Sequence, residues 1–188
     1  ESSARIGPPE HINNPNGSYR VLADVVPSFG AIGNSSPVSG LPPVITFFQN
    51  SVNTFLVPAS DANGNTLSFR LGTPAEATQN GTGTFVEPGP PNAPNALSIN
   101  PTTGLITWNT TGATLNGSST TLYSCHVIVQ DAPGTSNNRV GIDFMICLVP
   151  RPANPNPPVF DHPPTPQNGA LLDGCIGQTR TFTIQASD

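Results

Sequence analysis

Alternating apolar and polar positions predict a β-hairpin near the centre of the chain. Leu97 and Ile99 alternate with polar neighbours, residues 100–104 interrupt the pattern, and it resumes from Leu105 to Trp108. A period of two places successive side chains on opposite faces of a strand. The proline and the glycine in the interruption suit the positions that close a turn. We therefore predict two strands with one buried face each, anchored by Trp108, the only tryptophan of the chain.

The same period recurs in short runs along the chain, and no window has the spacing of an amphipathic helix. Turn-forming residues separate the runs, as a β-sandwich requires. Pro42-Pro43 suits an edge strand, where a missing N–H does not weaken the ladder. Residues 72–95 are rich in Gly, Pro, Asn and Thr and too long for a hairpin loop, so we expect a functional or decorated excursion there. The predicted strands are residues 19–25, 53–57, 66–71, 122–131 and 140–148.

Three segments resemble, in the right order, the cadherin-like and Ig-like repeats of bacterial surface and secreted proteins. Residues 96–108 are similar to the family's L-S-I-x-P-x-T-G-x-I-x-W signature. Residues 58–69 resemble its A-x-D-x-D-G-D-x-L-x-F segment, and residues 122–131 resemble its Y-x-V-x-V-x-V-x-D strand. The resemblance implies an all-β fold of antiparallel β-sandwich modules. It leaves the function open, because such modules carry many roles.

Internal repetition indicates Ig/cadherin-like modules in tandem, the terminal ones incomplete. The period of residues 19–25 matches that of residues 123–129, near the end of the central module. Pro157-Pro158-Val159 repeats Pro42-Pro43-Val44, and residues 181–188 repeat residues 54–61. The predicted parts are an N-terminal arm with late strands of a partial module (1–41), a complete sandwich (42–150), and a Pro-rich linker with the first strands of a further module (151–188).

An incomplete sandwich leaves an apolar edge open, and three interpretations follow. The chain is a window of a longer tandem protein, or the front strands of one copy complete the unfinished module of the next. The second case joins copies head to tail by strand exchange and builds a filament. In the third, the flanks are poorly folded, which the regular alternation in both flanks disfavours.

The composition restricts the classes of partner that the chain can bind. Charged residues make up 9 % of the chain, the net charge is −5, and all six basic residues are scattered arginines. A nucleic-acid partner is therefore disfavoured, because phosphates require grouped cations. No apolar run approaches the ~20 residues that span a bilayer, so we expect no membrane insertion. Because the charge is low, we expect attached glycan to hydrate the surface.

Cys125 and Cys147 lie on two predicted neighbouring strands. If the strands pair so that the two residues lie directly opposite, a cross-strand disulfide can form. The alternative is two buried thiols that act as small apolar side chains. Cys175 is left over, either as a free thiol or as a cross-link to a neighbouring chain.

Two kinds of candidate site remain. Five Asn-x-Ser/Thr triplets fall in predicted turns or loops and are candidate glycosylation sites: Asn16, Asn34, Asn80, Asn109 and Asn116. The resemblance implies calcium bound by acidic residues between modules, but only Asp61 survives of the family's D-x-D-G-D pattern. Asp61, Asp131 and Asp161 are therefore weak calcium candidates. The alternative is that these residues serve local turns. No other cofactor is expected.

The sequence contains no nucleophile elbow, phosphate loop or Cys-x-x-Cys pair, and its three histidines lack metal-ligand spacing. We therefore expect a non-enzymatic structural or adhesive extracellular protein. Its Ig-like modules would assemble with copies of themselves, end to end, into a glycosylated fibre or stalk. The alternative is a module of a larger adhesin or secreted enzyme that binds carbohydrate or a cell surface, with Phe85 of the 72–95 excursion as its aromatic contact.

Overall fold

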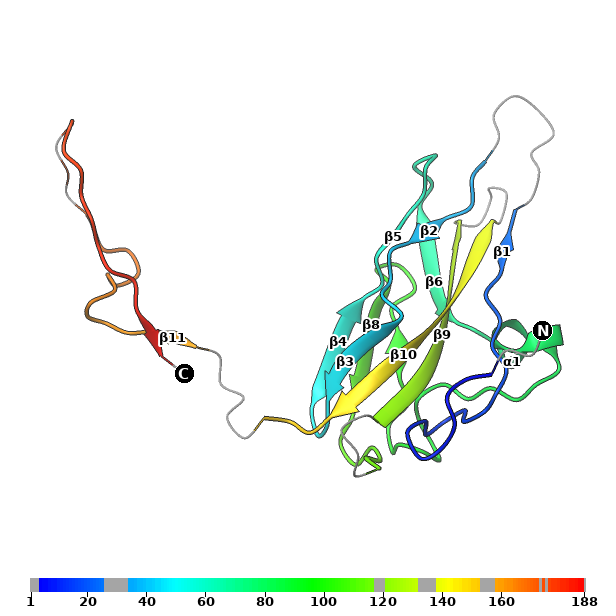
Figure 1. The fold of residues 1–188 in the computed structure, drawn as a ribbon. Helices are drawn as coiled ribbons and strands as arrows, with labels where there is room; N and C mark the ends of the chain where they lie inside the picture. Colours follow the sequence, from blue (N-terminus) through cyan, green and yellow to red (C-terminus); the bar gives the residue numbers. More distant parts are fainter. Residues whose placement is uncertain are drawn as a thin grey trace. The chain divides into compact units, whose positions relative to one another are not determined.

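The computed structural model describes residues 4–25, 34–116, 121–131, 138–152, 158–172, 174 and 176–187, apart from the side chain of Asn80. The fold is all-β, with mostly antiparallel pairing and almost no helix, as Figure 1 shows. The chain forms two compact units, Glu1–Arg151 and Pro152–Asp188, which are treated separately below. Within the described residues, no helix has the length and apolar character needed to cross a bilayer.

The larger sheet of the first unit is built around the two longest strands, which pair with each other antiparallel. Its strand order is β1-β10-β9-β6, and β3 pairs with β10 on the same side as β1. The pairing of β3 with β10 is parallel, whereas the others in this sheet are antiparallel. The strands are β1 (Ala23–Asp24), β3 (Val44–Phe48), β6 (Leu67–Leu71), β9 (Thr121–Asp131) and β10 (Arg139–Val149).

The smaller sheet contains the predicted hairpin, which is confirmed. Its order is β4-β8-β7, with β4 at Val52–Leu56, β7 at Ser98–Ile99 and β8 at Leu105–Asn109. Gly104 closes the turn with a φ of 72°, and a Cβ there would lie 2.8 Å from the Phe69 ring. This position therefore requires glycine both for its backbone conformation and for its space.

The core lies between the inner faces of the two sheets. Trp108 of β8 is fully buried, and its ring lies 5.0 Å from that of Tyr123 of β9 in an edge-to-face arrangement. The Phe47 ring of β3 lies 6.5 Å from the Trp108 ring. Ile106 and Phe144 join the same buried cluster. The alternation of β8 thus buries one face of the strand, as predicted.

The N-terminal segment belongs to the same compact unit as residues 42–150, and this corrects the expectation that residues 1–41 end a separate module. Ala23 of β1 pairs with Val140 of β10. Farther back, the Ile12 N–H donates to the Leu122 carbonyl at 2.9 Å. The physical reason is that β10 offers an edge not covered by β9, and the N-terminal segment supplies part of the missing pairing.

Part of the 72–95 excursion is helical. A short helix, α1 (Pro74–Ala77), begins with a capping box between Thr73 and Glu76, and a 3₁₀ turn, η1 (Gln79–Gly81), follows it. The Glu76 carboxylate also bonds Arg70 at 2.7 Å. These contacts fix the start of the excursion next to β6.

The second unit contains one short strand pair, β11 (Val159–Phe160) with β12 (Ala186–Ser187). Its register, Val159 opposite Ser187, matches that of β2 (Val38–Ser39) with β5 (Ala59–Ser60), where Val38 lies opposite Ser60. The strands β2 and β11 both begin at the valine of a Pro-Val-x-x-x-Pro-Pro run, at residues 37–43 and 158–164. The alignment of Val159 with Val44 expected from the sequence is therefore corrected to Val38.

Candidate functional site

A polar cluster is enclosed between the larger sheet and two segments that cover it. One face of β9, which includes Cys125, enters the core. The other face carries Ser124 and His126, and it is also buried. Residues 5–18 and 77–87 supply hydrogen-bond partners over this second face. The alternation predicted one buried face for this strand, and the cover buries both.

Arg5 joins the segments of this cluster, and the residue is only 3 % exposed. Its guanidinium donates to the Ser18 and Ala77 carbonyls and forms an ion pair with Asp143 of β10. The same cation lies 4.8 Å from the centre of the Phe85 ring. Phe85 is consequently buried, contrary to the expectation of an exposed aromatic contact.

His126 occupies a space that two glycines leave open. Its Nδ1 lies 3.2 Å from the Asp143 carboxylate. A Cβ on Gly72 would lie 2.3 Å from the imidazole Cδ2, and one on Gly141 would lie 3.0 Å from Nε2. The Phe85 ring packs against it edge-on at 6.2 Å. His126 Nε2 has no hydrogen-bond partner among the described residues. The sequence at positions 72 and 141 therefore makes room for a buried imidazole.

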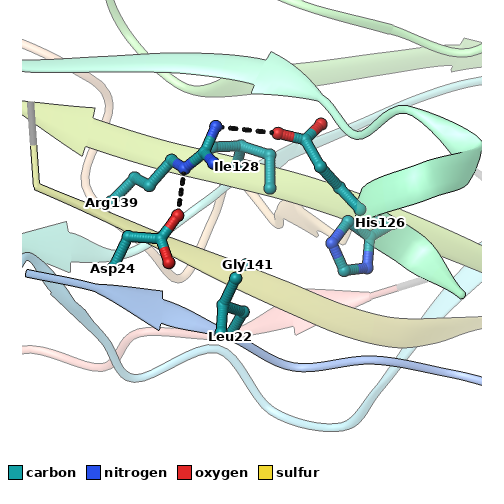
Figure 2. A pocket seen from close by; sticks show the side chains of 7 residues that line it. Leu22, Asp24, His126, Ile128, Arg139 and Gly141 are labelled. Atoms are coloured by element: carbon teal, nitrogen blue, oxygen red, sulfur yellow. Dashed lines mark hydrogen bonds and ion pairs between the residues drawn. The ribbon is translucent and has the colours of Figure 1, made fainter. Parts of the chain in front are cut away.

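A small cavity of about 10 Å³ lies beside His126 and is bounded by Ile128, Gly141 and Leu22 (Figure 2). That volume holds roughly one water molecule. Arg139 lies at this site, with its Nε 2.7 Å from Asp24 and an Nη 3.1 Å from a Glu76 oxygen, the two contacts drawn in Figure 2. These ion pairs tie β1 and α1 to β10. The cavity has no room for an organic substrate.

Glu87 and Cys125 titrate far from their usual ranges. The His126 N–H lies 3.2 and 3.3 Å from the two Glu87 oxygens. Burial of the carboxyl group raises the pKa of Glu87 to about 8, against the opposing effect of hydrogen bonds from Cys125 and the His126 N–H. Burial also raises the pKa of the Cys125 thiol well above its ordinary value. The thiolate is the nucleophilic form, so this cysteine is held in its unreactive form.

His11 and Ser124 form a second buried pair, with the Ser124 hydroxyl 2.7 Å from His11 Nε2. His11 Nδ1 lies 3.0 Å from the Ile6 carbonyl, a position that a carboxylate holds in a nucleophilic triad. Burial lowers the pKa of His11, which favours the neutral imidazole. The pair is closed off by Asn13, whose amide bonds the Ser124 backbone. The arrangement fastens the N-terminal segment to β9.

The predicted disulfide is contradicted by the strand register. Cys125 lies opposite Phe144, and Cys147 lies opposite Leu122, three residues from the expected pairing. Cys125 faces the core, whereas Cys147 lies on the other face of the sheet and is half-buried. Both cysteines are free. A shift by an odd number of residues places two side chains on opposite faces, and this excludes the bridge. Cys175 lies outside the described residues.

Each of the three calcium candidates accepts a hydrogen bond from another residue of the chain, and only that of Asp61 is local. Asp61 Oδ1 accepts from the Asn63 N–H at 2.8 Å, as a turn residue does. Asp131 Oδ2 accepts from the Asn34 side chain at 2.6 Å. Asp161 belongs to the second unit and accepts from Ser187. Across the part of the chain that the structure describes, no three His, Cys, Asp or Glu side chains are grouped to hold a metal ion.

The candidate glycosylation sites differ in their surroundings. Asn16 and Asn109 are exposed, although Asn109 is the last residue of β8 and not a loop residue. The side-chain amide of Asn34 is bonded to Asp131, and that of Asn116 donates to the Pro9 carbonyl at 2.6 Å. The side chain of Asn80 lies outside the described residues.

The raised pKa of Glu87 predicts how the stability of the first unit changes with pH. The folded state binds this proton more tightly than the unfolded chain does, so the contribution is complete below pH 4.5 and lost as the pH rises through about 8. We expect Glu87→Gln to flatten the pH profile in this window and to be more stable than the wild type at pH 8.5. Urea unfolding at several pH values, followed by Trp108 fluorescence, measures this.

Glu76→Gln is the companion variant, because the pKa of Glu76 is shifted in the opposite direction. The hydrogen bond from Arg70 is the main cause that lowers the pKa of Glu76 to about 2, so its contribution is present above pH 4.5 and lost as the pH falls through about 2. This variant should be less stable than the wild type at neutral pH. Parallel pH profiles of the wild type and Glu87→Gln would contradict the buried carboxyl.

Comparison with known proteins finds a similarity that covers most of the chain. No family model matches the sequence. The chain is 30 % identical, over 211 aligned positions and 93 % of its length, to the protein named Integrin beta-like protein A of Dictyostelium discoideum. It spans 10 % of the length of that protein. The chain is therefore similar to one stretch of a much longer integrin beta-like protein.

Proposed function

We propose that this chain works as part of an extracellular structural or adhesive protein built from repeated β-sandwich modules, without catalysing a reaction. Its 30 % identity to an integrin beta-like protein supports adhesion and a position outside the cell. The polar cluster supports a structural role, because Arg5 donates to the Ala77 carbonyl and Glu87 accepts from the His126 N–H, and both contacts join neighbouring segments. Binding of carbohydrate is the weaker alternative, since Phe85 is buried.

The repeated strand pairing carries the modular part of the proposal. The pair β11–β12 repeats the register of β2–β5 on two strands that share the Pro-Val-x-x-x-Pro-Pro and Ala-Ser sequences. The sequence repeat and the strand pairing thus agree in the second unit. We take this unit to be the opening of a module like the first.

The second unit exposes apolar side chains that a complete module would cover. Phe160, Phe182 and Ile184 are 63, 56 and 62 % exposed around an open hollow of about 570 Å³. In the proposed array, later strands of the same module cover them and the modules follow one another as a stalk. Strand exchange between copies is the less favoured route, because β1 already pairs with β10 and Arg5 is buried in its own unit.

Attachment of cells to coated surfaces tests the adhesive part. Cells should attach to the folded chain in greater number than to denatured chain at the same coating density, and soluble folded chain should compete. Equal attachment to folded and denatured chain would contradict adhesion.

The arrangement of the modules needs a separate measurement. Sedimentation of the purified chain should show a monomer if the modules are joined covalently. Electron microscopy of the full natural protein should then show globular units in a row. Head-to-tail polymers of the isolated chain would instead support strand exchange and overturn the covalent arrangement.

A further inference from the structure

The outer face of the smaller sheet carries no charge and exposes three apolar side chains, with the Thr54–Thr107 pair between them. The register of β4 with β8 places Val52 opposite Asn109 and Leu56 opposite Leu105 on this face. Val52, Leu56 and Leu105 are 66, 57 and 39 % exposed. No Asp, Glu, Lys or Arg occurs in the strands of this sheet or anywhere in residues 88–130. Exposed apolar side chains that share an uncharged face suit contact with another apolar surface.

Asn109 brings an acceptor for a sugar chain to the rim of that face. It begins the triplet Asn109-Thr110-Thr111, and its Oδ1 accepts from the Thr111 N–H at 3.1 Å. The residue is exposed, and no described residue forms a hydrogen bond with its Nδ2, the atom that an N-linked glycan occupies. Thr110 is buried and bonds the Phe48 carbonyl at 2.6 Å, which fixes the backbone behind the acceptor.

Two other triplets supply an internal contrast. The Nδ2 of Asn34 is used in a 2.6 Å bond to the Asp131 carboxylate. The Nδ2 of Asn116 is used in a 2.6 Å bond to the Pro9 carbonyl and so helps hold the N-terminal segment. A sugar on either nitrogen would displace a contact of the folded unit, whereas a sugar on Asn109 displaces none of the described contacts.

We propose that Asn109 carries an N-linked glycan whose first sugars lie over the apolar side chains of Val52, Leu56 and Leu105 on the outer face of the smaller sheet. The proposal rests on the extracellular setting of the proposed function, and not on adhesion. In the transfer, Nδ2 attacks C1 of a polyprenyl-pyrophosphate-linked oligosaccharide. A C1–N bond forms, the C1–O bond to the pyrophosphate breaks, and the amide loses one proton to the solvent.

Site mapping of the secreted protein tests the acceptor. The chain is produced in a eukaryotic secretory host, its glycans are released enzymatically in heavy-oxygen water, and the tagged asparagines are identified by mass spectrometry. Asn109 should be occupied, and Asn34 and Asn116 should not. Thr111→Ala should lose one glycan, whereas Thr111→Ser, which keeps the hydroxyl, should retain it. An unmodified Asn109, or equal occupancy at Asn34 and Asn116, would overturn the assignment.

Binding of an apolar fluorescent dye tests the covering of the face. Enzymatic removal of glycan should raise dye binding by the wild type. The Thr111→Ala variant should bind more dye from the start and change little on treatment. A glycosylated Val52→Ser/Leu56→Ser variant should also change little, because it lacks two of the three exposed apolar side chains. Unchanged dye binding by the deglycosylated wild type would refute the covering. A failure of cell attachment would not change any of these measurements, so the glycan proposal and the adhesion proposal are tested independently.

Discussion

Replacement of Arg5 by methionine is expected to lower the free energy of unfolding of the first unit by about 3–5 kcal/mol. The change leaves the Asp143 carboxylate, whose side chain is 9 % exposed, without its arginine. It also removes the bonds to the Ser18 and Ala77 carbonyls. Methionine keeps apolar volume against Phe85, so the loss reports mainly on the buried charge. Urea unfolding followed by Trp108 fluorescence measures the change.

Arg151→Met is the matched control, because Arg151 is exposed in the same unit. It should change the stability by less than about 0.5 kcal/mol. Asp143→Asn in the Arg5→Met background should recover part of the loss, since the amide carries no charge. A loss below about 1 kcal/mol for Arg5→Met would contradict a buried pair, because that is the value of an exposed one.

Trp108→Ala is expected to destabilise the first unit by about 3–5 kcal/mol. The side chain is fully buried against Tyr123 and Phe47, so its removal opens a cavity in the centre of the core. Its Nε1–H donates to the Asn95 carbonyl at 2.9 Å, and that acceptor loses its partner. Because Trp108 is the only tryptophan, far-UV circular dichroism in urea replaces fluorescence as the measurement.

Trp108→Phe should lose less stability than Trp108→Ala, because the ring partly fills the same space. The phenylalanine variant also keeps the prediction testable if the alanine variant does not fold. An alanine variant as stable as the wild type would contradict the position of this residue between the two sheets.

The central hairpin was predictable from sequence because all its determinants are local. Alternation sets the faces of β7 and β8, and Gly104 sets the turn. The register of β9 with β10 is not local in this way. The alternation of the two strands is compatible with several pairings, and the observed one lies three residues from the pairing expected for Cys125 and Cys147. Sequence therefore identified these strands without fixing their alignment.

The polar cluster was missed for a related reason. Arg5 and Glu87 lie in segments without periodicity, so nothing in the alternation indicates that they fold over β9. The sequence carried only indirect signals of this cluster. Charged residues are only 9 % of the chain, which makes each one a candidate for a specific contact. Gly72 and Gly141 also lack a turn role and instead leave space for the His126 ring.

The parallel pairing of β3 with β10 has a mechanical consequence. Val44 pairs with Met145 and Phe48 with Val149, so the chain enters β3 at one end of the ladder and leaves β10 at the other. Once tension on the chain reaches these two strands, it slides them past each other in shear. The slanted hydrogen bonds of a parallel ladder then resist together, whereas peeling would break them one at a time. The geometry suits a molecule that is pulled along its length.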